Sequence, residues 1–469
     1  MESIFTPKII YIVFIIFFAY FIILTFFYLL LAIVGLIEGG KRAKENQEEN
    51  YSLVYLSKVC IPITIIIPAH NEEEWIRDSV LSVVGLNYPN FELIVVDDGS
   101  TDNTINILNA VLKLKAIEMQ YVKHYKDGRV IEILKSQSYP NVRVVFKEKG
   151  TKKAGAVNAG LNISKNDYVC VIDADTVLEP DSLLKIMASV EKDAERIIGI
   201  GSYFSLSNGI KIKDGKVVEK TFSYNPLIAY QNLEYIRSFI GNRIAWSRYN
   251  AMPTLAGGFA IWRRDILYEL GGFSPDFTCE DIELTFRAHD YIAKNKNRNL
   301  KIIMLPFNVG WTEGPSNIRS LISQRNRWQR VTNETVWKYK YMFCNPRYNS
   351  FAFLTLPYFI FYEVLGVFFE IASIGFVVWG WLIGALNVNI FITFLALIVL
   401  SQILISLLSI LAFIRCQKVF RVQYISHLVF LSFFEFILYR WIISIGKLVG
   451  TYEYLKGNKE QTRYVRAKR

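Results

Sequence analysis

Two aspartates at the end of an apolar run carry the clearest chemical signal in the chain. The segment YVCVIDADTV places Asp173 and Asp175 one residue apart, directly after Val169–Ile172, which is predicted to be a buried strand of a parallel sheet. In open α/β sheets, ligands bind beyond the carboxyl ends of the strands. Two carboxylates there can share one hard cation with phosphate oxygens and water. A simple turn explains a lone D-x-D equally well, so other motifs must decide.

A second acidic strand end lies earlier in the chain. The predicted strand Phe91–Val96 runs into DDGSTDNT, so Asp97 and Asp98 follow it directly. These carboxylates could bind ribose hydroxyls or a base, or they could only shape the turn. The strand Ile63–Ile67 precedes PAHNEEEW, in which Asn71 is expected to cap the next helix.

Two lysines and two glycines are further candidates between these motifs and the later helices. Lys152 and Lys153 open a helix in the Gly/Ala-rich turn GTKKAGAVNAGL, where small residues let backbone N–H groups approach a phosphate. The spacing differs from that of a P-loop. Gly257 and Gly258 mark a point where a ligand or a second backbone must come close.

Two later helices carry further candidates. Glu280 and Asp281 begin an amphipathic helix, where they could act in chemistry or only complement the helix dipole. The segment SQRNRWQR is either a basic surface helix or a clamp for a diphosphate with an aromatic platform. With Arg319, which lies just before this segment, four arginines and a tryptophan cluster within twelve residues: Arg319, Arg325, Arg327, Trp328 and Arg330.

The strand–acidic turn–helix pattern predicts a doubly wound α/β domain over residues 51–348, preceded by an anchor over 1–40. Within this domain the polar stretch 113–141 is predicted to be helical. Residues 9–37 contain no charge, and neither do residues 371–414. About 20 apolar residues cross a bilayer, so both runs are predicted membrane spans. Residues 349–450 are therefore assigned to transmembrane or interfacial helices, and residues 451–469 to a basic tail.

Charge and cysteine content narrow the functional class. The net charge of +11 is concentrated beside the apolar segments, which is typical of cytoplasmic loops facing anionic lipid headgroups. The sequence contains no basic motif with interleaved aromatic residues, so nucleic-acid binding is not predicted. The five cysteines show no metal or redox spacing, which favours a reduced cytosolic face.

Taken together, VVDDGSTD, DADT, EDIELTFR and QRNRW, in this order and followed by membrane segments, resemble the family-2 inverting glycosyltransferases of GT-A fold. The membrane-embedded processive branch is most similar: the hyaluronan, poly-N-acetylglucosamine, chitin and cellulose synthases. The resemblance covers residues 62–329 and the flanking spans. It implies a Rossmann-like nucleotide-binding domain inserted between transmembrane helices. It further implies a UDP-sugar donor, transfer with inversion, Mg²⁺ or Mn²⁺, and a plasma-membrane enzyme with a cytoplasmic catalytic domain.

The resemblance also implies a role for each motif residue. Asp173 and Asp175 would hold the metal, Asp281 would be the general base beside Glu280, and Arg327 would hold the diphosphate. The donor would contact Pro68, His70, Asn71, Glu72, Asp98, Lys152, Lys153 and Asp173. The acceptor would contact Gly257, Gly258, Gln324 and Trp328. The usual T-E-D reads Cys279-Glu280-Asp281 here, which keeps the base but displaces a hydroxyl.

Three functions remain open at this stage. The first is processive polysaccharide synthesis and extrusion, favoured by Q-x-x-R-W, and the second is transfer of one sugar to a polyprenyl phosphate or glycolipid. The third is a transporter or receptor that senses a nucleotide without turnover. Predicted spans at 357–386, 389–414 and 423–446 would place the C-terminus outside, although the tail's basic residues favour inside. Four predicted spans are few to form a pore in one chain, which suggests that the protein associates with itself or with a partner.

Overall fold

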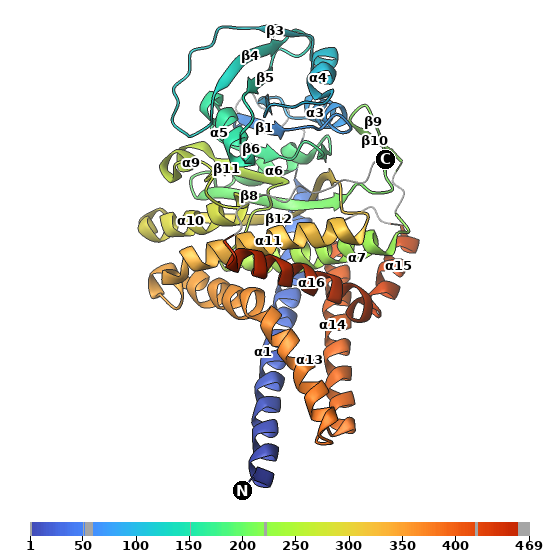
Figure 1. Ribbon diagram of the computed structural model, residues 1–469. Coiled ribbons are helices and arrows are strands. Elements are labelled where there is room, and N and C mark those ends of the chain that lie inside the picture. The colour runs from blue at the N-terminus through green and yellow to red at the C-terminus, as the bar shows by residue number, and fades with distance from the viewer. Residues whose placement is uncertain are drawn as a thin grey trace.

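The computed structural model describes residues 2–49, 51, 60–150, 152–219, 223–417 and 421–457. The α/β domain is built on a ten-stranded mixed sheet (Figure 1). Strands β5, β2, β1 and β6 run parallel at its centre. In spatial order the strands are β3 (Leu114–Ala116), β4 (Val130–Ser136), β5 (Val142–Lys147), β2 (Phe91–Asp97), β1 (Ile63–Ala69), β6 (Tyr168–Ile172), β11 (Phe259–Arg263), β8 (Ile197–Leu206), β12 (Lys301–Thr312) and β7 (Val177–Leu178).

The central strands fold as the sequence predicts because their side chains are apolar on both faces. Strands β1 and β6 are buried almost throughout, as expected of parallel strands covered on both sides. Helix α5 (Lys153–Ile163) packs on β1 and β2. The register pairs Ala69 with Asp97 and Ile63 with Tyr168, so the carboxyl ends of β2, β1 and β6 form one edge. The acidic strand ends therefore meet, as the spacing predicted.

Two sequence expectations are wrong in detail. The stretch 113–141 is not helical: it contributes the antiparallel edge strands β3 and β4, whose exposed residues hide the strand pattern. Asn71 does not cap a helix, because helix α3 begins at Ile76 and Asn71 has φ +58°. Asparagine tolerates this left-handed conformation. Its side chain instead accepts a hydrogen bond from the Thr101 backbone N–H at 2.8 Å, which ties the end of β1 to the loop after β2.

Three helical segments below the sheet carry most of the remaining candidates. The segment 226–248 consists of α7 (Pro226–Tyr235), the π-helix η1 (Ile236–Arg243) and α8 (Ile244–Arg248). Helix α10 spans Asp281–Lys294 and α11 spans Ile318–Lys338. The Asn317 side chain caps α11, accepting from the Ser320 N–H at 2.9 Å.

Long apolar helices extend away from the domain on one side (Figure 1). Two helices are long and apolar enough to cross a membrane: Tyr11–Glu48 within α1 (Glu2–Glu48), and α14 (Val388–Cys416). Two bent pairs could add further crossings. In the first, residues 351–364, which end in the π-helix η6 (Phe359–Val364), meet α13 (Gly366–Leu382) at 44°. In the second, α15 (Val422–Ser432) meets α16 (Glu435–Leu455) at 76°.

The bend at α15–α16 changes the expected membrane organisation. The sequence predicted one span over 423–446, but α16 turns away and lies alongside α11 of the domain (Figure 1). Close packing is possible because a Cβ on Gly450 would lie 2.6 Å from the Asn326 carbonyl oxygen. Helix α16 is therefore part of the floor beneath the domain. The basic tail predicted over 451–469 lies mostly outside the described residues.

Candidate active site

One large cavity, of about 1470 Å³, opens at the carboxyl edge of the sheet and continues between the membrane-side helices. Its lining includes every residue to which the family resemblance gave a role, but not Asp97, Arg319 or Arg330. The included residues are Pro68, His70, Asn71, Glu72, Asp98, Lys152, Lys153, Asp173, Asp175, Gly257, Gly258, Glu280, Asp281, Gln324, Arg327 and Trp328. Residues more than 250 positions apart in the chain thus share one space.

A lysine joins the acidic residues at the centre of the cavity. The Lys153 ammonium, at the start of α5, lies 2.6 Å from Asp173 Oδ1 and 3.0 Å from Glu280 Oε1. It also donates to the Gly257 carbonyl at 3.1 Å. Burial lowers the pKa of Lys153, but Asp173 and Glu280 more than offset this, so its pKa is raised and the ammonium stays charged. Lys153 therefore ties the D-x-D strand end to the start of α10.

The Asp281 carboxylate is held by two backbone donors. The Ile282 N–H donates to Oδ1 at 2.9 Å, and the Gly257 N–H donates to Oδ2 at 3.2 Å. Burial raises the pKa of Asp281, and the neighbouring Glu280 raises it further. A fixed carboxylate with a raised pKa is suited to accept a proton near neutral pH. This geometry favours chemistry over the simpler reading of Asp281 as a helix-dipole acid.

Gly257 lies among three charged groups. A Cβ there would lie 3.4 Å from Lys153 Nζ, 3.5 Å from Glu280 Oε1 and 3.6 Å from Asp281 Oδ2. A Cβ on Gly258 would lie 3.3 Å from Asp173 Oδ2. A Cβ at Gly257 would therefore make only ordinary contacts, whereas one at Gly258 would be tight against Asp173.

The strand-end acids fit a metal only with help from a ligand. Asp175 is buried and its Oδ1 accepts from the Thr312 hydroxyl at 3.0 Å, while Asp173 contacts Lys153. Within the described residues, no group of three or more His, Cys, Asp or Glu side chains could hold a metal ion. Mg²⁺ commonly takes one or two carboxylates and completes its shell with substrate phosphate and water. The pair fits that pattern.

Sequence reasoning missed one residue that holds Asp98 in place without lining the cavity itself. The buried Lys147, at the end of β5, forms an ion pair with Asp98, and the Gly150 N–H donates to Asp98 Oδ1 at 2.9 Å. Asp98 Oδ1 is therefore fixed before any ligand arrives. The strand VRVVFK also carries Arg143, so the lysine at its end gave no distinct local signal.

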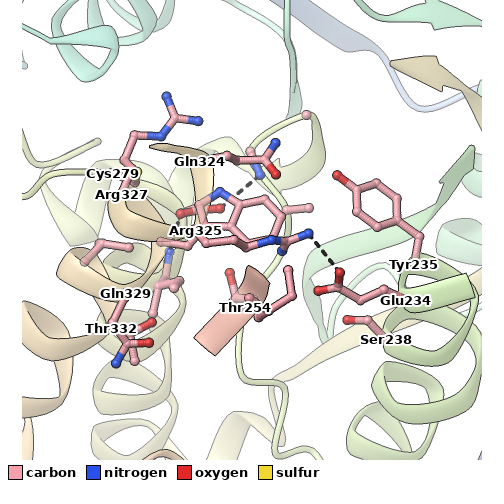
Figure 2. Close-up of a pocket in the computed structure, with 18 of the residues that line it drawn as sticks. Glu234, Tyr235, Ser238, Thr254, Cys279, Gln324, Arg325, Arg327, Gln329 and Thr332 are labelled. Carbon is pink, nitrogen blue, oxygen red and sulfur yellow. Dashed lines mark hydrogen bonds and ion pairs between the residues drawn. The ribbon is translucent and has the colours of Figure 1, made fainter. Parts of the chain in front are cut away.

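Helix α11 presents its motif from the opposite wall. Arg327 and Gln324 point into the cavity, where Arg327 Nε and Gln324 Oε1 have no hydrogen-bond partner among the described residues (Figure 2). Burial lowers the pKa of Arg327, but Cys279, Asp173 and the α10 acids offset this, so its pKa is raised. Because both groups are unsatisfied and buried, they are suited to bind a polar ligand.

Trp328 is backed by a network that the sequence did not reveal. The Arg325 guanidinium lies 4.1 Å from the centre of the Trp328 ring. Arg325 Nη2 lies 2.8 Å from Glu234 Oε2 (Figure 2). Tyr439 of α16 donates to the same oxygen. Three separate helices thus orient one indole ring. Only tertiary packing brings Glu234 and Tyr439 to this position, so no local pattern could have identified them.

The fold and this site define a GT-A glycosyltransferase domain attached to membrane helices. The model for "Glycosyl transferase family 2" matches residues 64–271, and that for "Glycosyl transferase family group 2" matches residues 168–438. The second covers more than half of the chain. The chain therefore belongs to the family-2 glycosyltransferases, as the motifs predicted.

Individual relatives agree with this membership. "Probable glycosyltransferase YdaM" of Bacillus subtilis is 27% identical over 344 residues, covering 72% of this chain and 71% of the relative. Poly-beta-1,6-N-acetyl-D-glucosamine synthase of Staphylococcus epidermidis is 25% identical over 277 residues, covering 58% of this chain and 55% of the synthase. The chain is thus matched to about half of that synthase.

A solved structure supports the fold. Mannosyltransferase PcManGT from Pyrobaculum calidifontis, in complex with GDP-Man and Mn²⁺, aligns with a TM-score of 0.53 at 16% identity. The alignment covers 84% of this chain and 98% of the mannosyltransferase. At this identity, the likeness concerns the architecture alone.

Proposed function

We propose that this glycosyltransferase moves a sugar from a UDP-sugar to a growing glycan at the membrane, with inversion at the anomeric carbon. One observation carries the proposal: the Asp281 carboxylate, with a raised pKa, shares a cavity with the Asp173–Asp175 pair and with the membrane helices. A base, a donor site and a path towards the membrane therefore adjoin one another. Its relatives include a synthase named for a polymer of N-acetylglucosamine, which supports this choice.

The donor would lie along the carboxyl edge of β1, β2 and β6. Pro68, His70, Asn71 and Glu72 would line the nucleotide, with Asp98 at the base and Lys152 beside Lys153 near the phosphates. Asp173 and Asp175 would hold Mg²⁺ or Mn²⁺, and the metal would neutralise charge on the diphosphate. The position of these residues at the carboxyl edge of the sheet, where open α/β sheets bind ligands, supports this assignment.

The acceptor would enter from the opposite wall. Asp281 would take the proton of the attacking hydroxyl, assisted by the charge of Glu280, while Arg327 binds the departing diphosphate. A single displacement inverts the anomeric centre and needs no carboxylate nucleophile, unlike the double displacement of retaining enzymes. Trp328 would stack on an acceptor sugar, with Gln324, Gly257 and Gly258 around it.

We further propose that the chain crosses the membrane three times, through α1, α13 and α14. Helices α13 and α14 form a hairpin whose turn lies at the same end as the N-terminus, away from the domain (Figure 1). Helices α15 and α16 would lie along the surface. The domain and the basic tail then share one side, which resolves the conflict between the span count and the positive charge. Because the proposed donor is a cytosolic nucleotide sugar, we propose that this side faces the cytoplasm and that the membrane is the plasma membrane.

Product size tests the proposal directly. Purified full-length protein in proteoliposomes receives radiolabelled UDP-N-acetylglucosamine, UDP-glucose or UDP-galactose with Mg²⁺ or Mn²⁺, and products are separated by length. We expect a water-soluble polymer, absent in Asp281→Asn. A single-sugar glycolipid would instead support transfer to a lipid acceptor. Binding without any turnover would refute the enzyme.

A further inference from the structure

The membrane-side part of the cavity has a distinctive charge pattern. This part, called the corridor below, lies beyond Trp328 and is lined from α1, α7, η1, α11, η6, α13, α14 and α16. Its ionised side chains are arranged as pairs. The first pair is Arg325 with Glu234, described above, and the second is Arg237 with Glu435. Arg237 is bidentate, with Nη1 at 2.9 Å from Oε2 and Nη2 at 2.6 Å from Oε1.

Two further pairs lie deeper among the membrane-side helices. Lys447 Nζ of α16 lies 2.7 Å from Glu363 Oε2 of η6. Arg440 of α16 pairs with Glu370 of α13, and the Ser444 hydroxyl donates to Glu370 Oε2 at 2.6 Å. Each of the four pairs either includes a residue of α16 or is bonded to one, since Tyr439 completes the first pair. Helix α16 thus balances the charge along the whole corridor.

Arg243, like Arg327, is a lining cation that does not follow this pattern among the described residues. Its Nη1 is buried without a hydrogen-bond partner among the described residues. Burial lowers its pKa to about 10, and the nearest acid that opposes this effect is Asp281. Its charge therefore belongs to the reaction centre, where donor phosphates and Asp281 provide the counter-charge, and not to the corridor.

Balanced pairs select against charged ligands. A partly buried ion is stable when it is paired. A charged group of the ligand placed beside such a pair is attracted by one member and repelled by the other. A chain with one carboxylate on every second sugar would need unpaired Lys or Arg along its path, and a chain of free amines would need unpaired acids. Hydroxyl and acetamido groups, by contrast, can bond to the spare lone pairs and N–H groups of paired ions.

Building on the proposed function, we infer that the acceptor glycan carries no net charge. Its units are neutral hexoses or N-acetylhexosamines, and neither uronates nor free amino sugars enter the corridor. The charge balance of the four pairs therefore limits the substrate class.

Incorporation and binding together test the inference on the full-length protein. We expect label from a neutral UDP-sugar in polymer and none from UDP-glucuronate, alone or mixed with the neutral donor. Incorporated glucuronate would overturn the neutral-acceptor inference while leaving glycosyl transfer intact; no incorporation from any donor would refute the proposed function instead. Binding is measured independently by tryptophan fluorescence, using hexamers of N-acetylglucosamine, glucosamine and hyaluronan. We expect the first to bind at least tenfold more tightly, and equal binding would overturn the inference.

A charge swap isolates the contribution of the pairs. Glu363→Gln leaves Lys447 unpaired, so the hyaluronan hexamer should bind at least tenfold more tightly than it binds to the unaltered protein. Glu363→Lys combined with Lys447→Glu restores the pair in reverse and should restore the original preference. If the single and the double variants bind the hexamers alike, the pairing does not set the preference.

Discussion

Substituting Gly450 tests whether α16 controls the active site from a distance. A Cβ on Gly450 would lie 2.6 Å from the Asn326 carbonyl oxygen and 2.8 Å from Gln329 Cβ. Most Cβ contacts are longer than 3.4 Å, so α16 and α11 must separate by about 0.8 Å. Backbone atoms cannot rotate away, and overpacking of this kind costs about 1–3 kcal/mol. Gly450→Ala should therefore shift α11 without unfolding the protein.

The expected loss of activity follows from what α11 carries. Arg327 and Trp328 lie one and two residues beyond Asn326, and misplacement by about 1 Å can lower a rate about 100-fold. We expect Gly450→Ala to lower kcat about 10- to 100-fold with a smaller change in the donor KM. Initial rates of UDP release and thermal unfolding are measured together, so that activity is compared at equal folded fraction.

Gly375 provides the matched control. It lies within α13, and a Cβ there meets nothing within 4 Å among the described residues. Gly375→Ala removes a helix-interior glycine, which favours the helix by up to about 1 kcal/mol, and should keep its activity. If Gly450→Ala is folded and as active as Gly375→Ala, then α16 does not position α11 and the reasoning is refuted.

Three further predictions concern the reaction centre. Asp281→Asn should lower the transfer rate about 100- to 10,000-fold while donor binding persists, as checked by calorimetry with a UDP-sugar. Because the pKa of Asp281 is raised, activity should fall with decreasing pH at a higher pH than for an ordinary aspartate. Glu280→Gln removes the negative charge that opposes ionisation of Asp281 and so lowers its pKa. The acidic limb of the kcat/KM profile should therefore move to lower pH. Chelation with EDTA should abolish activity, Mn²⁺ should restore it, and Asp175→Ala should raise the Mn²⁺ concentration required.

The strand-end residues of the site could be predicted because their signals are local. A run such as ITIII or YVCVI is apolar on both faces, which marks a central strand, and the next residues must then lie at the ligand-binding edge. This reasoning placed Asp98, Asp173 and Asp175 without knowledge of their contacts. It failed for 113–141 because edge strands expose polar residues and lose the alternating pattern.

The residues that hold the motifs in place could not be predicted. Lys147 reaches Asp98 from a neighbouring strand, and Glu234 and Tyr439 reach Arg325 from two other helices. Each contact depends on the relative placement of distant elements. A buried charge has no sequence signature of its own, because the same lysine or glutamate is common on surfaces.

Helix α16 shows most clearly why hydropathy alone assigns membrane segments incompletely. Its sequence joins an apolar run to Glu435, Arg440 and Lys447, which is expected either of a span with buried ions or of a helix lying on a domain. The 76° bend and the glycines facing α11 favour the second arrangement. All three charges then face the cavity and pair with η1, α13 and η6 instead of lipid. The ions that look costly in a span are thus explained as paired side chains in the wall of the cavity.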